Sequence, residues 1–256
     1  MKTFKRVAFD LIGSREKAVA VITDLNMDLK EAKEAGENIM ARYKHVKCVI
    51  QKTGKRTGKY RIYSYRHLLG SKRYLVVQKE YGYRLKGNPT KVHFSPREGE
   101  ERERIVKQVK DGERILYLFS GVAPYAVAIA KKRNVEIVCI EWSSTAVRYA
   151  RENVKLNKLK NVKIVNGDAK KCVKYGMFDR IIMPLGTMAI DYLKYAGRCV
   201  EKGSVIHLYG KTENAGKDLE KEVKKILKQK YKILNVRKIS SFSPGVEKVC
   251  LDILIC

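Results

Sequence analysis

The second half of the chain alternates short apolar runs with amphipathic segments, and this rhythm limits the possible folds more than any other feature. The apolar runs lie at residues 115–119, 136–140, 162–165, 180–183, 205–208, 233–236 and 249–253. Helical periodicity fills gaps between them, as at residues 143–157 and 217–229. Such alternation is typical of parallel βαβ units with helices on both faces of one sheet. No helix separates the last two runs, so we expect an α/β, Rossmann-like, seven-stranded and mostly parallel sheet that ends in an antiparallel hairpin.

The first part of the chain has a different pattern and predicts a small α+β domain. Strand-like runs lie at residues 6–12, 18–22, 46–51, 59–64 and 74–79. Asp28 is suited to cap a helix over residues 28–43, because Ala32 and Ile39 fall on one face behind it. The turn cluster Gly87-Asn88-Pro89 marks the boundary. We therefore expect a small domain over residues 1–88 and a catalytic domain over residues 89–256.

The charge of the chain indicates a polyanionic partner. Lys and Arg number 55 against 27 Asp and Glu, which gives a formal charge of +28 over 256 residues. Residues 44–66 contain eight of these cations and no acid, and tyrosines are interleaved with them. Cationic groups neutralise phosphates and tyrosine rings stack on unpaired bases, so this segment suits single-stranded or loop RNA.

Other functional classes find little support in the composition. No stretch of about 18 residues is apolar and uncharged, and the first ten residues reach Asp10 before a signal-peptide segment could form. The six cysteines are widely spaced without a CxxC pair or a nearby histidine, so we expect reduced, mostly buried thiols and no metal site. We expect a cytoplasmic protein that contacts no membrane.

Three successive strand ends carry residues suited to a nucleoside cofactor. Gly121 forms a turn directly after the first strand of the second domain, where a ligand can approach the backbone. Glu141 ends the second strand, where its carboxylate can accept both ribose hydroxyl protons, and Asp168 follows the third near an expected adenine edge. Trp142 can cover the adenine face. A single glycine in place of GxGxxG favours S-adenosylmethionine over NAD.

Longer motifs extend these observations to nearly the whole chain. They are AFDLIG, GKYRIYSYRHLLG, KEYGYRLKGNPTKVHFSPREGEER, LFSGVAPYAVAIAKK, EWSSTAVRYARENVKLNKLKNV, NGDA, FDRIIMPLG and SFSPGVEKVCLDI. With them the chain resembles the archaeal and eukaryotic tRNA (guanine-37, N1) methyltransferases and their wybutosine-pathway relatives. The resemblance implies a class I methyltransferase fold, S-adenosylmethionine as cofactor and the anticodon stem-loop of tRNA as partner. We expect the protein to act as a monomer.

The resemblance also implies roles for individual residues. Glu101 matches the acid that removes the proton from the purine ring nitrogen, and Arg61 matches the arginine that stabilises charge on the guanine oxygen. The matches to the cofactor pocket are Arg97, Phe119, Gly121, Val122, Glu141, Asp168 and Ala169, and we also expect Trp142 and Pro184 to contact the cofactor. The contacts that we expect with the anticodon stem-loop come from Lys55, Arg56, Lys59 and Arg61.

Three departures from the family pattern leave the reaction open. Tyr117 stands where the family usually has aspartate, and His93 replaces the tyrosine before FSPR. Pro184-Leu185-Gly186 replaces Asn-Leu-Pro, so an amide expected to touch the cofactor or target base is missing. The substrate is therefore guanosine or a tricyclic wyosine intermediate. Two alternatives remain: an aminocarboxypropyltransferase of the wybutosine pathway, whose PGV motif this chain shares, and a catalytically silent tRNA-binding homologue.

Overall fold

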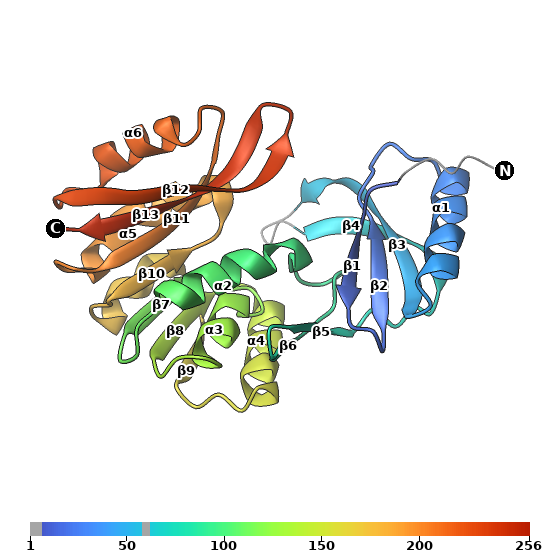
Figure 1. Ribbon diagram of the computed structural model, residues 1–256, viewed down its shortest axis with the longest axis horizontal. Coiled ribbons are helices and arrows are strands. Elements are labelled where there is room, and N and C mark those ends of the chain that lie inside the picture. The colour runs from blue at the N-terminus through green and yellow to red at the C-terminus, as the bar shows by residue number, and fades with distance from the viewer. Residues whose placement is uncertain (1–6, 58–61) are drawn as a thin grey trace. The chain divides into compact units, whose positions relative to one another are not determined.

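Residues 100–256, all of which the structure describes, form one seven-stranded sheet (Figure 1). Its strands are β7 (Arg114–Leu118), β8 (Glu136–Glu141), β9 (Val162–Asn166), β10 (Arg180–Met183), β11 (Val205–Thr212), β12 (Tyr231–Ser243) and β13 (Val246–Ile255). Their order across the sheet is β12-β13-β11-β10-β7-β8-β9. All neighbouring pairs from β11 to β9 are parallel, whereas β13 runs antiparallel to both β11 and β12. The predicted sheet and its terminal hairpin are thus confirmed.

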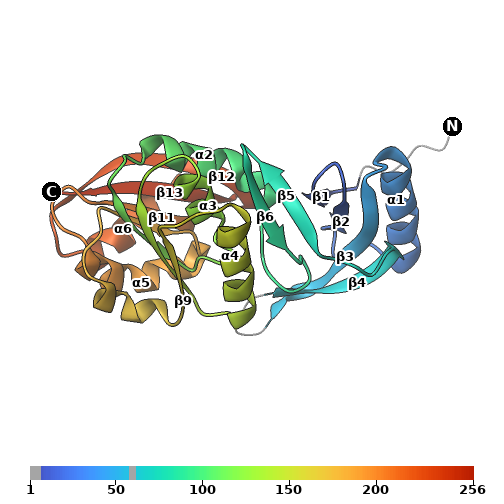
Figure 2. The same ribbon diagram turned by 90° about the horizontal axis from the view of Figure 1, so that it is seen from below.

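Helices cover both faces of this sheet. They are α2 (Gly99–Gln108), α3 (Pro124–Ala130), α4 (Ser144–Leu156), α5 (Ala189–Ala196) and α6 (Lys217–Ile226). Side chains of β7 alternate between the faces, because successive residues of a strand point in opposite directions. Tyr117 packs edge-on against Tyr125 of α3, whereas Leu116 and Leu118 join the cluster that contains residues of α5 and α6. Figure 2 shows α2 and α5 on opposite sides of the sheet.

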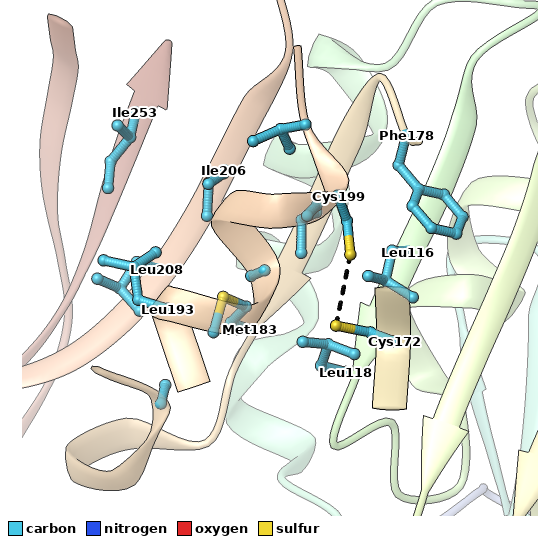
Figure 3. Close-up of a cluster of buried hydrophobic side chains, with 14 of the residues drawn as sticks. Leu116, Leu118, Cys172, Phe178, Met183, Leu193, Cys199, Ile206, Leu208 and Ile253 are labelled. Carbon is cyan, nitrogen blue, oxygen red and sulfur yellow. Dashed lines mark hydrogen bonds between the residues drawn. The ribbon is translucent and has the colours of Figure 1, made fainter. Parts of the chain in front are cut away.

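The larger core of the second unit lies between the sheet and α5 and α6 (Figure 3). Strand side chains such as Ile181, Ile206 and Leu208 are fully buried there against Leu193 of α5. Short 3-10 helices complete this layer: η2 (Ala169–Tyr175) follows β9, η3 (Gly186–Met188) precedes α5, and η4 (Gly197–Cys199) follows it. Because helices cover both faces of this sheet, its strands must be apolar along nearly their whole length. This explains why each strand could be recognised in the sequence as an apolar run.

The first unit, Met1–Gly99, is a separate compact body, of which the structure, a computed structural model, describes residues 7–57 and 62–99. In this described part, a four-stranded sheet has the order β1-β2-β3-β4. Its strands are β1 (Phe9–Gly13), β2 (Ala18–Ile22), β3 (Val46–Thr57) and β4 (Ile62–Gly70). Helix α1 (Leu29–Arg42) packs against one face through Ala32, Ala35 and Ile39. Asp28 caps it as predicted, because its Oδ1 accepts the N–H of Glu31 at 2.8 Å.

The opposite face of this sheet is covered by a hairpin that the sequence only half predicts. Strand β5 (Val76–Glu80) was expected, but its partner β6 (Tyr83–Gly87) was not. Val76 is buried against Val21 and Ile50 of the sheet, and Gln78 Oε1 accepts the N–H of Gly13 at 2.7 Å. The hairpin therefore belongs to the first unit.

The two compact units of the structure are Met1–Gly99 and Glu100–Cys256. The turn cluster at residues 87–89 predicts a boundary at residue 88. Residues 88–99 pack with the first unit: Val92 is buried, and η1 (Pro96–Glu98) contacts β1. Arg97 there binds Asp10 with a Nε–Oδ1 distance of 2.6 Å. None of the helices in the described part of the chain is both long and apolar enough to cross a membrane.

Candidate active site

The loop after β7 has a backbone that few residues tolerate. Phe119, Gly121 and Ala123 have φ angles of +56°, +54° and +62°, in the left-handed region. Two of these residues carry a Cβ, and such strain persists only where the surroundings fix it. The Phe119 ring packs edge-on against Tyr192 at 4.8 Å between centroids. The N–H of Gly121 donates to Glu141 Oε2 at 2.8 Å, so the loop is tied to the end of the next strand.

Glu141 is the central acceptor of this edge of the sheet. Its Oε2 accepts the N–H of Gly121 and its Oε1 accepts the N–H of Ser143, both at 2.8 Å. Each carboxylate oxygen has two lone pairs, so each retains one for a further donor. Two acceptor positions on one carboxylate match the two hydroxyls of a ribose ring.

The end of β9 is hydrogen-bonded to the backbone at the end of β8, at Glu141 and Trp142. The N–H of Gly167 donates to the carbonyl oxygen of Glu141 at 3.0 Å. Asn166 Nδ2 donates to the carbonyl oxygens of Glu141 and Trp142 at 3.0 and 2.9 Å. The loops that carry Gly121, Glu141 and Asp168 are thus held together by hydrogen bonds. Sequence reasoning missed Asn166, although an asparagine at a strand end directly before Gly-Asp was a usable signal.

The remaining expected pocket residues lie in or beside these loops. Asp168 caps η2 by accepting the N–H of Lys170 at 2.9 Å, and Ala169 behind it is buried. Val122 is buried and its carbonyl oxygen accepts from Asn153 Nδ2 of α4 at 3.0 Å. Trp142 keeps 48% of its surface exposed beside Glu141.

These loops fit a nucleoside cofactor such as S-adenosylmethionine. In the described part of the chain, Ser120 Oγ is buried next to Gly121 and has no hydrogen-bond partner. A buried hydroxyl without a partner is rare in native proteins and is satisfied when a polar ligand binds. Together with the two open acceptor positions of Glu141, this hydroxyl supplies the polar groups that a nucleoside requires.

The loop after β10 differs from the family pattern in its backbone. Pro184 is half-buried directly after the strand, and Gly186 has φ +68°. Proline has a fixed φ near −65°, so the proline of Asn-Leu-Pro could not occupy this conformation at position 186. The replacement therefore changes the path of the loop as well as removing an amide side chain.

Glu101 of α2 is a buried carboxylate with donors from three residues around it. Only 4% of its surface is exposed. Its Oε1 accepts from Arg104 Nη2 at 2.8 Å and from the Tyr209 hydroxyl at 2.6 Å. Its Oε2 accepts from Arg104 Nε at 2.8 Å, and Arg237 Nε lies 3.4 Å from the same oxygen. Oε1 has two close donors, whereas the second position of Oε2 holds only the longer contact with the partly exposed Arg237, which another donor can displace.

A buried charge network holds Arg104 in place. Arg104 Nη1 binds Asp252 Oδ2 at 2.5 Å, and Asp252 Oδ1 accepts from His207 Nδ1 at 2.6 Å. Burial would raise the pKa of Asp252, but the hydrogen bonds from His207 and Arg104 lower it far below its usual value. Arg180 Nη1 lies 2.7 Å from His207 Nε2, which places the histidine proton on Nδ1. The negative Glu101 carboxylate is thus paired with the positive Arg104, which is in turn paired with the negative Asp252.

Glu101 reaches the cofactor loops through tyrosines rather than by direct contact. Its described partners come from α2, β11 and β12, not from the strand ends that bear Gly121, Glu141 and Asp168. The Tyr209 ring lies 6.0 Å from the ring of Tyr125, the second residue of α3, two positions after Ala123. Sequence reasoning missed Arg104, Tyr209 and Asp252, because nothing local marks them as partners.

The other expected residues lie in the first unit. Arg97 pairs with Asp10, and its Nη2 donates to the carbonyl oxygen of Phe9 at 3.4 Å. Lys55 and Arg56 belong to strand β3. Lys59 and Arg61 lie outside the described residues.

The buried His207 predicts a loss of stability below about pH 6.5. Burial and the nearby guanidinium groups lower its pKa from 6.5, although Asp252 opposes this. The unfolded chain therefore binds a proton that the folded protein does not, so this contribution is present above pH 6.5 and lost as the pH falls. Urea unfolding should show a free energy smaller by up to about 2 kcal/mol at pH 5 than at pH 7 from this group. His207→Asn should abolish this pH-dependent part of the free energy of unfolding, whereas the control His45→Asn should retain it. Equal pH dependence of unfolding in both variants would contradict the role given to His207.

One cluster in the described residues has the composition of a metal site. His207, Cys250 and Asp252 place ligand atoms within 4.8 Å of one another, all buried. Both ring nitrogens of His207 already face Arg180 or Asp252, and Arg104 binds Asp252. Two guanidinium charges beside the cluster disfavour a further cation, so these residues serve the Glu101 network.

The second unit has the fold and site of a Rossmann-like class I methyltransferase. Its seven strands lie in the order given above, a strained glycine loop follows β7, and a carboxylate ends β8. A family model described as the TRM5/TYW2 methyltransferase domain matches residues 76–236. The chain belongs to this TRM5/TYW2 methyltransferase family.

Individual relatives extend the match over the whole chain. The tRNA (guanine(37)-N(1))-methyltransferase Trm5b of Pyrococcus abyssi is 34% identical, over 98% of this chain and 76% of that protein. The tRNA(Phe) (4-demethylwyosine(37)-C(7)) aminocarboxypropyltransferase of Methanocaldococcus jannaschii is 30% identical, over 90% of this chain and 95% of that protein. Among solved structures, a complex of aTrm5 and tRNALeu superimposes with a TM-score of 0.88 and 30% identity, covering 98% of this chain and 72% of that one.

Proposed function

We propose that this protein transfers a methyl group from S-adenosylmethionine to N1 of guanine 37 in tRNA. The observation that carries the proposal is the buried Glu101, whose carboxylate is fixed by Arg104 and Tyr209 while Oε2 keeps only one further, longer contact, with the partly exposed Arg237. The similarity to Trm5b over nearly the full chain supports the same reaction. S-adenosylmethionine supplies an electrophilic methyl group on a sulfonium centre.

The residues of the chain have separate tasks in this reaction. Glu141 would accept the ribose hydroxyls, and the loops with Phe119, Val122, Asp168 and Ala169 would hold the nucleoside together with Trp142. Glu101 Oε2 accepts the proton that leaves N1 of the guanine, which makes N1 nucleophilic. Arg104 and Tyr209 orient this base, and Arg61 stabilises the negative charge that develops on the guanine oxygen.

The first unit provides the tRNA contacts in this proposal. Its basic segment, with Lys55, Arg56 and Lys59, binds phosphates of the anticodon stem-loop, and the target base leaves the stack to reach the catalytic residues. The solved complex of a relative with tRNALeu supports such binding. The protein acts as a monomer in the cytoplasm.

Removing charge from the basic segment should weaken tRNA binding in a salt-dependent way. Each phosphate contact releases about 0.9 counterions, so Lys55→Ala and Arg56→Ala should each reduce the slope of log affinity against log salt by about one unit. Filter binding with tRNA at several salt concentrations measures this slope. Lys30→Ala, an exposed lysine of α1, is the control that should leave it unchanged. An unaltered slope in both basic-segment variants would place the tRNA elsewhere.

Aminocarboxypropyl transfer to a tricyclic wyosine intermediate is the second candidate. The PGV motif at residues 244–246, which this chain shares with that branch of the family, favours it.

A labelling experiment separates the candidates. Purified protein is incubated with an unmodified tRNA transcript and S-adenosylmethionine that is labelled either in the methyl group or in the carboxyl carbon. Methyl transfer predicts label in tRNA from the first cofactor alone, and a transcript with adenosine at position 37 should lose it. Label from the carboxyl carbon, with tRNA carrying the wyosine precursor, would establish the second candidate. Cofactor and tRNA binding without any transfer would identify a silent homologue.

A further inference from the structure

Two cysteines of the second unit meet in the core below the cofactor loops. Cys172 of η2 and Cys199 of η4 are both fully buried, and their Sγ atoms lie 3.5 Å apart. Figure 3 shows the two sulfurs pointing toward each other among Leu116, Leu118 and Phe178. The residues are 27 positions apart in the sequence, so the fold brings them together.

The geometry leaves little movement for a covalent bond. A disulfide requires sulfurs about 2.05 Å apart, so the two Sγ atoms must approach by about 1.5 Å. Both cysteines lie in short 3-10 helices rather than in strands. Cys139 in β8, by contrast, is buried in a strand of the same sheet.

The surroundings distinguish the two thiols chemically. The Cys199 S–H points at Cys172 Sγ and can also donate to the carbonyl oxygen of Tyr195 at 3.5 Å. The hydrogen bond from Cys199, backbone N–H groups of η2 and the charge of Arg198 lower the pKa of Cys172, although burial opposes this. Cys172 is thus the better nucleophile and Cys199 the resolving thiol.

We propose that Cys172 and Cys199 form an intramolecular disulfide when the protein meets a small oxidant such as hydrogen peroxide. The Cys172 thiolate attacks one peroxide oxygen, which gives a sulfenic acid and releases hydroxide. Cys199 then attacks the sulfenic sulfur, the S–S bond forms, and the sulfenic oxygen leaves as water. Two thiols and one peroxide give one disulfide and two waters.

The bond would connect two segments that support the cofactor loops. Helix η2 begins directly after Asp168, and η4 ends the segment that starts at Pro184 and includes α5. Closing this loop restricts the unfolded chain, so oxidation should raise the melting temperature by about 5–10 °C.

The test uses the full chain with Cys256→Ser, because Cys256 is the exposed cysteine of the described residues and could link two molecules. The protein is treated with hydrogen peroxide, or unfolded and refolded in a glutathione redox buffer so that the thiols are accessible. Free thiols are then alkylated, and the digest is analysed by mass spectrometry without reduction. We expect a linked peptide pair containing Cys172 and Cys199 and the higher melting temperature. Both should disappear in Cys172→Ser and in Cys199→Ser but persist in Cys139→Ser.

Failure to find the linked peptides after both treatments would overturn the proposal. It would also be overturned by oxidation of Cys172 to sulfinic or sulfonic acid while Cys199 remains a free thiol. A linked pair whose melting temperature equals that of the reduced protein would show that the bond forms without supporting these loops, against the proposed effect. None of these readouts depends on methyl transfer.

Discussion

Replacing Glu101 with glutamine should lower the rate of methyl transfer by at least about 100-fold, because a general base contributes about 10²–10⁴ to the rate. The amide cannot accept the N1 proton, and it turns a donor toward Arg104 Nε, where the carboxylate had an acceptor. Cofactor affinity should stay within about threefold of wild type, because the described contacts of Glu101 do not include the cofactor loops. Single-turnover kinetics with saturating tRNA measure the effect.

Two variants make this result interpretable. Glu100→Gln changes the neighbouring, exposed carboxylate and should keep wild-type activity. Glu101→Asp keeps the buried negative charge opposite Arg104 but withdraws it by one methylene, so a folded Glu101→Asp protein with strongly reduced turnover separates loss of the base from loss of the fold. Turnover of Glu101→Gln close to that of wild type would remove Glu101 from the mechanism.

Replacing Glu141 with alanine should weaken cofactor binding by about 100-fold or more. The substitution removes the acceptor of the Gly121 and Ser143 amides, which fixes the loop after β7, and the proposed acceptor of the ribose hydroxyls. Hydrogen bonds to a charged group contribute about 1.5–3 kcal/mol each, and each 1.4 kcal/mol is tenfold in affinity. Isothermal titration with S-adenosylmethionine measures the dissociation constant.

Glu136 offers a matched control, because it begins the same strand that Glu141 ends. Its side chain is 74% exposed and meets Arg114 at 3.7 Å. Glu136→Ala should therefore bind the cofactor as tightly as wild type. An unchanged dissociation constant in Glu141→Ala, with the melting temperature of the apo protein preserved, would exclude the proposed cofactor role of this carboxylate.

The fold was predictable because its determinants are local. Buried parallel strands need continuous apolar runs, which are visible in the sequence. The start of α1 is equally local, because Asp28 caps the helix by accepting the N–H of Glu31, three residues later. The strand-end residues Gly121, Glu141 and Asp168 were also predictable, because carboxyl ends of parallel strands share one edge of a sheet. The hydrogen bonds between these loops agree with that expectation.

The surroundings of Glu101 were not predictable in the same way. Arg104 and Asp252 are 148 residues apart, and their contact depends on how α2 packs on β13. The pairing of Arg97 with Asp10 is a similar case, because the Gly-Asn-Pro turn between them marks a bend but does not reveal this contact. Such long-range pairs are set by tertiary packing, which single-sequence patterns do not encode.

Mass spectrometry of nucleosides tests the proposed activity most directly. Unmodified tRNA is incubated with the protein and S-adenosylmethionine, then digested completely, and its nucleosides are compared with those of an untreated sample. Methyl transfer to guanine 37 predicts 1-methylguanosine, absent when position 37 carries adenosine. A digest without any methylated guanosine, from protein that binds both tRNA and cofactor, would contradict the proposed reaction.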